Sequence, residues 1–524
     1  MIAGAVSMRP VFHYRASRVT PRVQQCAAVL PLLIAMTVGS AAVRAETVGA
    51  SPTNRDPVWH CFTASDAHER RTSVERGMLP RVVFEGRSQP ATLDGRMTQH
   101  KVPALAVAVI RQGRLDWSAA YGSLGSNFGL AGCDSLFQAG SLAKPVTLLA
   151  ALRMRRTGLI DLDRDVDRYL GSWHLPPGQQ TPSNPVTFRN LLSHTSGITP
   201  GGYRGYADGE AIPTDQQVAN GTPPANSPKV EVLRPPGEEL SYSGGGYTVV
   251  EIALQDLLRR PFEQILGEWV LTPVGMRQAD FTQPLPAASH ARAARGHDGE
   301  GGAVRGGWHT HPEQAAAGLW ATPSDMAVFL IELWKGYHGQ SRVFDQASLR
   351  EMLANPVDGH AYGFRLIGDG DGTFITHYGG TVGYTAGMTM NLATGNGAVF
   401  MTNAEGGSNL GREFLQSVSR VYDWPMFRET RVTAVEQPVE ALQSLTGRYV
   451  FAEQDWQVSV VVEAGSLTLV FPNGDRYGMV PISGGPMEFI HPDTAVLAGF
   501  DVERGEARIR LYGQVGTRET GSNR

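Results

Sequence analysis

The hydrophobic pattern of this chain changes near residue 430, and the change limits the folds open to it. Between about residues 85 and 428, stretches with the spacing of amphipathic helices alternate with stretches that have the alternation of strands. From about residue 437 onward, apolar residues alternate with polar ones on either side of a Pro-Asn-Gly-Asp turn at 472–475, which is typical of β-hairpins. The sequence therefore predicts a large α/β (α+β) body over 85–428 and a small all-β domain over 437–524, joined by a linker at 429–438.

The same patterns assign individual elements within the body. Alternating apolar residues predict strands over 105–110, 114–121 and 135–138 and a strand pair over 383–402. Apolar residues three or four positions apart predict helices over 141–157, 247–258 and 324–335, the first of which stops at Gly158. Residues 200–236 are rich in glycine and proline and have no period, so we expect a long surface excursion of the kind that often frames a site.

Composition excludes several classes of protein. Of 524 residues, 46 are basic and 50 are acidic, which gives a formal net charge of -4. This balance argues against a protein that binds nucleic acid through bulk charge. Because 42% of the residues are hydrophobic and only 18% are charged, the chain can bury a large core, and disorder and collagen-like repeats are excluded.

The first 45 residues are typical of a secretory signal peptide. They contain five arginines and no acidic residue, and an apolar stretch runs from residue 27 to 43. A membrane anchor needs about 20 apolar residues, which this stretch does not reach. We expect cleavage near Ala45, an N-terminal extension over 46–84, no membrane span after cleavage, and a periplasmic or secreted protein. Removal of the five arginines leaves 41 basic residues against 50 acidic ones, a net charge near -9.

Three cysteines occur in the sequence. Cys26 lies in the signal peptide before its apolar core, where a lipid attachment site is not expected. Cys61 and Cys133 either form a disulfide in an oxidising compartment or remain free thiols, and the sequence leaves both possibilities open. The absence of a CxxC pair makes a structural zinc site an unlikely use of these residues.

One motif combines a nucleophile with a base. Ser141 and Lys144 form an S-x-x-K pattern at the start of the predicted helix, and a step of three residues places both side chains on one helical face. Serine is a weak nucleophile at its ordinary pKa, and a lysine whose charge is disfavoured by burial can accept its proton. The helix N-terminus adds positive potential where an oxyanion would form. By itself, the pattern favours the simpler interpretation, a serine helix cap beside a surface lysine, so further motifs are needed to support catalysis.

Two further motifs support the catalytic interpretation. Tyr242 lies in a Ser-Tyr-Ser-Gly-Gly-Gly turn before a predicted helix, and a tyrosinate held by nearby cations could relay a proton from serine to a leaving group. His377 opens a His-Tyr-Gly-Gly segment in which glycines allow the backbone to approach a ligand closely. One of the backbone N–H groups in that segment could be an oxyanion donor.

Together with other segments in the same order, these motifs resemble one enzyme superfamily. The additional segments are Leu-Leu-Ser-His-Thr-Ser-Gly-Ile at 191–198, Leu-Thr-Pro-Val-Gly-Met at 271–276 and Ala-Gly-Leu-Trp-Ala-Thr-Pro-Ser-Asp-Met at 317–326. Over about 85–425 the chain resembles the serine β-lactamase and penicillin-binding-protein superfamily, specifically its class C β-lactamase-related branch. The resemblance implies an antiparallel sheet flanked by helices beside a helical lobe, with the active site in the cleft between them. The all-β segment resembles the barrel-like accessory domains of some members.

The resemblance also implies roles for individual residues. Ser141 matches the acylated nucleophile, Lys144 its base partner, and Tyr242 the tyrosine that assists acylation and deacylation. His377 falls where β-lactamases have the lysine of a K-T-G motif, and members that act on other substrates often have histidine there. The implied oxyanion hole consists of the backbone N–H groups of Ser141 and Gly380.

Three further positions are implied to contact substrate: Gly244, Tyr378 and Gly379. Gly244 departs from the family pattern, since it replaces the asparagine that grips a substrate amide. His377 is a weaker anchor for a substrate carboxylate than lysine, because an unperturbed imidazole is mostly uncharged at neutral pH. We therefore expect an acyl-enzyme hydrolase that acts on a small ester, peptide or amide rather than an efficient β-lactamase, with no cofactor. The alternative is a catalytically silent protein that binds penicillins or peptidoglycan fragments.

Other candidate sites have simpler interpretations. Four alternating aspartates at 161–167 suggest calcium, but Val166 occupies the position where such a loop needs glycine, so we expect a solvated loop face. His309, His311 and Glu313 could be metal ligands on one face of a strand, but a lone H-x-H pattern is more typical of a surface or a cleft wall. His194 could be a triad base, but Lys144 already has that role. We expect no metal.

Overall fold

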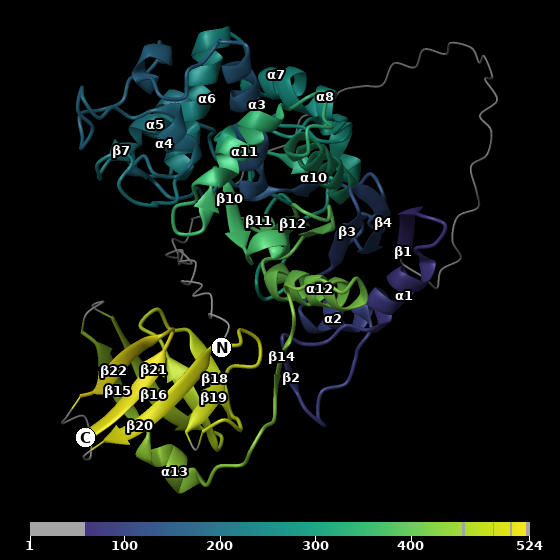
Figure 1. Cartoon of the computed structure of the whole chain (residues 1–524), viewed down its shortest axis with the longest axis vertical. Coiled ribbons are helices and arrows are strands. Elements are labelled where there is room, and N and C mark those ends of the chain that lie inside the picture. Colours follow the sequence, from purple (N-terminus) through teal and green to yellow (C-terminus); the bar gives the residue numbers. More distant parts are fainter. Residues whose placement is uncertain (1–57, 453–455, 486, 504–505, 520–524) are drawn as a thin grey trace, which may run out of the picture.

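The computed structural model describes residues 58–452, 456–485, 487–503 and 506–519, and Figure 1 shows their arrangement. The expected signal peptide and its cleavage site lie outside the described residues. A mixed helix and sheet body occupies the upper part of Figure 1, and a barrel follows at the C-terminal end. None of the described helices combines the length and hydropathy that crossing a membrane requires.

The body is built around one antiparallel sheet. Its strand order is β1-β4-β3-β13-β12-β11-β10-β9, and every neighbouring pair runs antiparallel. The strand bounds are β1 Val58–Thr63, β3 Ala104–Arg111, β4 Arg114–Gly122, β9 His360–Ala361, β10 Phe364–Ile367, β11 Phe374–Thr381, β12 Tyr384–Asn391 and β13 Gly397–Thr402. The predicted strands near 105 and 114 and the predicted pair over 383–402 are therefore present, and the fold-class prediction is confirmed.

Helices cover both faces of this sheet, which explains why its central strands are apolar on both sides. On one face, Leu105, Val107 and Val109 pack with α12 and the N-terminal helices. On the other face, Ala106 and Ala108 pack with α3 and α10. The helix bounds in the body are α1 His68–Arg76, α2 Leu93–Gln99, α3 Ala143–Arg156, α4 Phe188–Leu192, α5 Asp215–Asn220, α6 Gly244–Leu258, α7 Phe262–Leu266, α8 Thr272–Val274, α9 Gln314–Ala317, α10 Pro323–Tyr337, α11 Gln346–Ala354 and α12 Gly407–Val421.

The segment before the body contributes to the main sheet. Strand β1 pairs with β4 at the sheet edge, so residues from 58 onward extend the sheet that continues into the body. Cys61, in β1, forms a disulfide with Cys133, which resolves the alternative that the sequence left open. Strand β2 (Val82–Phe84) pairs in parallel with β14 (Thr430–Val432), so the expected linker at 429–438 contains a short strand.

The C-terminal segment is a closed antiparallel barrel. Alternating residues such as Val458, Val460, Leu467 and Leu469 are almost fully buried inside it. A short helix, α13 (Val439–Ser444), precedes the barrel and adds a leucine to this core. The barrel strands are β15 Gly447–Phe451, β16 Trp456–Glu463, β17 Ser466–Val470, β18 Arg476–Pro481, β19 Glu488–Ile490, β20 Leu497–Glu503, β21 Glu506–Leu511 and β22 Gln514–Arg518.

Three elements differ from the sequence-based expectation. The strand expected over 135–138 is only β5, Phe137–Gln138, which pairs with β8, Trp320–Ala321. The expected excursion over 200–236 contains α5 and β7 (Glu231–Val232), and β7 pairs with β6 (Ile198–Thr199). The helix expected over 141–157 begins with a 3-10 turn at Gly140–Leu142 before α3. The first two differences arise because short strands pair with segments that are far away in the sequence.

Candidate active site

Ser141 lies in the 3-10 turn at the start of α3, which directs its side chain out of the helix N-terminus. Gly140 permits this turn because its φ is +53°, a conformation that other residues rarely adopt. A Cβ at Gly140 would also lie 2.9 Å from the amide nitrogen of Gly380. The turn that carries the candidate nucleophile is thus packed tightly against strand β11.

Lys144 is adjacent to Ser141, as the motif predicts. Its Nζ donates to Ser141 Oγ over 3.1 Å and to the carbonyl oxygen of Ala316 over 2.7 Å. The side chain is 2% exposed, and no carboxylate among the described residues forms an ion pair with it. Burial disfavours the charged ammonium and lowers the pKa of Lys144 to about 7. A lysine in this state can accept a proton from serine at neutral pH.

Tyr242 lies beside the same amine. Its ring centroid is 5.0 Å from Lys144 Nζ, and the residue is 40% exposed. Burial of the hydroxyl raises the pKa of Tyr242 above its ordinary value, and a hydrogen bond with Ser141 only partly opposes this shift. The neutral phenol is therefore the resting form, so the tyrosinate considered from the sequence is not favoured. A neutral phenol can donate a proton to a leaving group.

His377 lies on β11, near the ring of Tyr242. The two rings are 6.4 Å apart, and His377 is 8% exposed. Burial and the neighbouring Lys144 lower the pKa of His377 to about 3, so the imidazole is neutral at physiological pH. The next residue, Tyr378, lies 6.3 Å from Phe400, which belongs to the core on the α12 side of the sheet. Tyr378 therefore lies away from the serine, although the sequence implied that it contacts substrate.

Backbone of β11 approaches the serine turn at Gly379 and Gly380. A Cβ at Gly379 would overlap the carbonyl oxygen of Ala139 and lie 3.0 Å from the amide nitrogen of Ser141. Only glycine permits this approach. The amide nitrogens of Ser141 and Gly380 thus belong to two backbone segments in direct contact, which is the arrangement that two oxyanion donors require.

Gly244, expected to contact substrate, is covered by a neighbouring loop. The residue is buried, and a Cβ there would lie 3.1 Å from Cε2 of Tyr203 and 3.2 Å from the carbonyl oxygen of Gly201. The Gly244 N–H donates to that same carbonyl over 3.0 Å. The Tyr203 hydroxyl is held 2.8 Å from Thr248 Oγ1. The side of the site next to Gly244 is therefore filled by protein.

His194 contributes to the site in a way that the sequence motifs did not indicate. Its ring lies 4.3 Å from the ring of Tyr242, and its Nδ1 accepts from the backbone N–H of Ser243 over 3.1 Å. Burial lowers the pKa of His194 well below its usual range, so the ring is neutral. His194 supports the tyrosine and is not a base for Ser141. The Leu-Ser-His-Thr-Ser-Gly segment was the only sequence signal for it.

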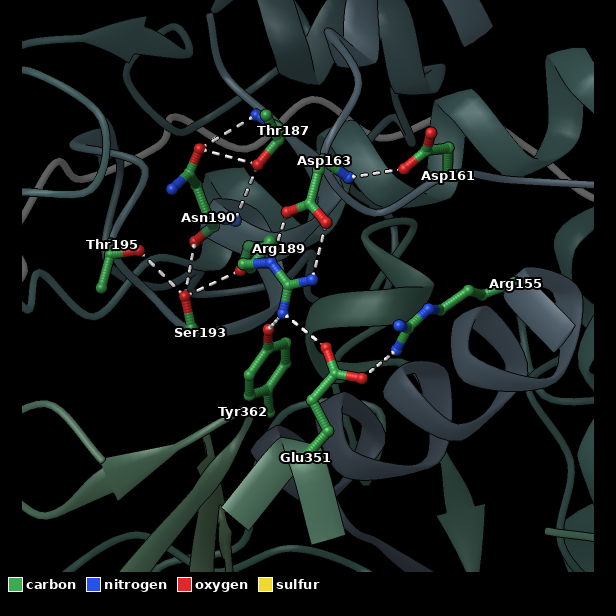
Figure 2. Close-up of polar contacts among 10 residues, drawn as sticks. All are labelled: Arg155, Asp161, Asp163, Thr187, Arg189, Asn190, Ser193, Thr195, Glu351 and Tyr362. Atoms are coloured by element: carbon green, nitrogen blue, oxygen red, sulfur yellow. Dashed lines mark hydrogen bonds and ion pairs between the residues drawn. The ribbon is translucent and has the colours of Figure 1, made fainter. Parts of the chain in front are cut away.

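A network of polar contacts holds the segment that carries His194 (Figure 2). Arg189 on α4 bonds to Asp163 over 2.7 Å, to Glu351 on α11 over 3.0 Å and to the hydroxyl of Tyr362. Ser193 caps the end of α4 through the carbonyl of Arg189 over 2.7 Å. The network therefore ties the turn before His194 to the loop after α3 and to α11.

The remaining candidate sites have structural roles. The alternating aspartates, expected on a solvated loop face, serve as turn caps and ion-pair partners: Asp163 with Arg189, Asp161 with the backbone N–H of Asp163, Asp165 with that of Asp167, and Asp167 with His174. His311 is fully buried, and His309 Nδ1 donates to the carbonyl oxygen of Arg204 over 3.0 Å. Over the described ranges, no group of three metal-ligating side chains converges on a point.

Comparison with known proteins agrees with the site geometry. Residues 90–416 match the protein family described as Beta-lactamase. Penicillin-binding protein 4 of Amycolatopsis lactamdurans is 28% identical over 309 residues, which are 56% of this chain and 76% of that protein. D-alanyl-D-alanine-carboxypeptidase/endopeptidase AmpH of Escherichia coli (strain K12) is 26% identical over 246 residues, 44% of this chain and 59% of that protein.

A solved structure shows the same fold. The octameric penicillin-binding protein homologue from Pyrococcus abyssi aligns with a TM-score of 0.56 at 18% identity, covering 81% of this chain and 98% of that one. The family match extends over more than half of the 524 residues. The chain therefore belongs to the Beta-lactamase family, whose members are penicillin-binding-protein and D-alanine-carboxypeptidase-like serine hydrolases.

Proposed function

We propose that this protein is a serine hydrolase that forms an acyl-enzyme on Ser141. The observation that carries the proposal is the contact of 3.1 Å between Ser141 Oγ and Lys144 Nζ, in which the lysine is buried and has a pKa near 7. At neutral pH about half of such lysines are uncharged, which follows from equality of pH and pKa.

In the proposed acylation, neutral Lys144 takes the proton of Ser141 while Oγ attacks the substrate carbonyl carbon. The backbone N–H groups of Ser141 and Gly380 stabilise the oxyanion of the tetrahedral intermediate. The phenol of Tyr242 gives its proton to the leaving group and regains one from the Lys144 ammonium. Water then attacks the acyl carbon and gives a proton to the neutral Lys144 amine, and Ser141 Oγ takes up that proton from Lys144 or Tyr242 as the acyl–oxygen bond breaks and the acid leaves.

We propose small esters as the preferred substrates, ahead of small peptides and amides, with β-lactams last. A neutral His377 supplies no charge to anchor a substrate carboxylate. The wall next to Gly244 is filled by Tyr203, so no side chain is available there to grip a substrate amide. Esters need neither contact, and they have better leaving groups than amides.

We also propose that residues 1–45 direct the chain to the periplasm or outside the cell and are removed near Ala45. The disulfide between Cys61 and Cys133 supports this proposal, because disulfides persist in oxidising compartments. Mass measurement of the protein recovered from the periplasm or the medium tests it. A mass that includes residues 1–45 would contradict cleavage.

The function is tested by reacting the purified protein with a fluorophosphonate and measuring its intact mass. We expect one adduct, mapped by peptide analysis to Ser141 and absent from Ser141→Ala, with labelling at least 100-fold slower in Lys144→Ala, in line with the loss of a positioned base. Lys101→Ala is the matched control, because Lys101 is a surface residue paired with Glu300. A folded protein without an adduct would favour a silent binding protein, and an adduct on another serine would refute the assignment.

A further inference from the structure

Helix α9 determines where the amine of Lys144 lies. This helix is a single turn, Gln314–Ala317, and the carbonyl oxygen of Ala316 accepts from Lys144 Nζ over 2.7 Å. Apart from Ser141, Ala316 supplies the only hydrogen-bond partner of this amine among the described residues. A single helical turn is not stable by itself, because nucleation fixes several residues for one hydrogen bond. The position of Lys144 therefore depends on whatever holds α9.

The N-terminal end of α9 is held by a residue of another helix. An N-cap side chain normally accepts the free N–H groups of the first turn. Glu313 is the N-cap residue of α9, but its side chain makes no such bond, and both of its carboxyl oxygens are buried without a hydrogen-bond partner in the described structure. Glu251 on α6 supplies the missing acceptor, because Oε2 of Glu251 accepts from the N–H of Ala315 over 2.8 Å.

Glu251 is placed to act without charge. Its side chain is fully buried, and no arginine, lysine or histidine of the described chain forms an ion pair with it. A buried carboxylate without a cationic partner is costly, so the neutral acid is favoured. Burial and the acidic neighbours accordingly raise the pKa of Glu251 well above its ordinary value. The titratable groups around it are Asp215 on α5, Glu313 before α9 and Tyr203 in an adjoining loop.

We propose that Glu251 is a positioning residue of this site, whose uncharged carboxyl group holds α9 and thereby keeps the Ala316 carbonyl oxygen at the Lys144 amine. Helix α6 begins directly after Tyr242 and Ser243 and contains Glu251 two turns later. One rigid helix therefore fixes both the tyrosine and, through α9, the lysine. This inference rests on the proposed role of Lys144 as the base.

The test compares replacements of Glu251 that keep or remove its oxygen acceptor. Glu251→Gln retains an oxygen acceptor for the Ala315 N–H and is uncharged, so kcat and KM for an ester should stay within about threefold of the wild type. Glu251→Leu removes the acceptor, and we expect kcat to fall about 100-fold with KM little changed, as for a misplaced catalytic group. Glu313→Gln is the matched control, since Glu313 is equally buried but bonds to no amide of α9; it should stay within about threefold.

Each outcome decides the proposal. A Glu251→Gln variant as slow as Glu251→Leu would show that charge or proton exchange is required and would refute the uncharged positioning role. A Glu251→Leu variant with wild-type kcat would refute it as well. Circular dichroism and the melting temperature verify folding, and Glu251→Met replaces the leucine variant if that variant does not fold. Absence of a fluorophosphonate adduct on the wild type would instead refute the proposed function, so the two failures are distinguishable.

Discussion

The pKa of Lys144 should set the acid limb of the pH–rate profile. Burial lowers this pKa from 10.5 to about 7, and acylation requires the neutral amine. Below pH 7 the neutral fraction falls about tenfold for each pH unit, so it is on the order of 1% at pH 5. We therefore expect kcat/KM for a neutral ester to be about 100-fold lower at pH 5 than on its plateau above pH 8.

None of the three other titratable side chains nearest Ser141 and Lys144 produces a limb at this pH. The pKa of His377 is lowered to about 3, the pKa of His194 lies well below its usual range, and the pKa of Tyr242 is raised. The measurement is kcat/KM from pH 5 to 9, followed in a pH-stat so that product absorbance does not depend on pH. The control Lys101→Ala should keep the limb, because this exposed lysine pairs with Glu300.

Three results would contradict the reasoning. A limb centred below pH 5 would assign the base to a carboxylate or to a histidine, and one above pH 9 would mean that the amine keeps a proton affinity typical of solvent-exposed lysine. A limb that persists at pH 7 in the residual activity of Lys144→Ala would likewise assign it to another group.

Other perturbations have equally specific outcomes. Gly379→Ala inserts a methyl group into the backbone that carries Ser141, so kcat/KM should fall at least 100-fold, about as much as the loss of an oxyanion donor causes. Gly372→Ala is the control and should stay active, because a Cβ there meets nothing closer than 3.8 Å. Cys61→Ser opens a cross-link between residues 72 apart in sequence, which should lower the free energy of unfolding in urea by about 4 kcal/mol; an unchanged transition midpoint would contradict this. Burial raises the pKa of Glu313 to about 8, so the folded state holds a proton that the unfolded state releases above about pH 4.3, and stability falls as pH rises through this window. Glu313→Gln should flatten that fall by at most about 1.4 kcal/mol per pH unit between pH 5 and 8, measured by urea unfolding, and parallel curves for both proteins would refute it.

Local patterns in the sequence were enough to find the residues that we propose as nucleophile and base. A three-residue step in a helix places two side chains on one face whatever the rest of the chain does, so Ser141 and Lys144 meet as expected. The strands near 105 and 114 and the all-β character of the C-terminal segment could be predicted for the same reason, because alternation and turn residues act over a few positions. That these strands close into a barrel was implied only by the family resemblance. The short pairs β5-β8 and β6-β7 were not visible, since each joins segments far apart in sequence.

The sequence by itself therefore determined which side chains could react, and the tertiary structure decided their state. The pKa of Lys144 is lowered only because α3, α6 and α9 exclude water from its amine, and no local pattern records that burial. The acceptor that positions it is the carbonyl oxygen of Ala316, a backbone group that every residue carries and that no motif can mark. Glu251 lies 107 positions after Lys144 and reaches α9 only once the chain has folded. Hydrogen bonds between helices depend on packing and not on spacing along the sequence.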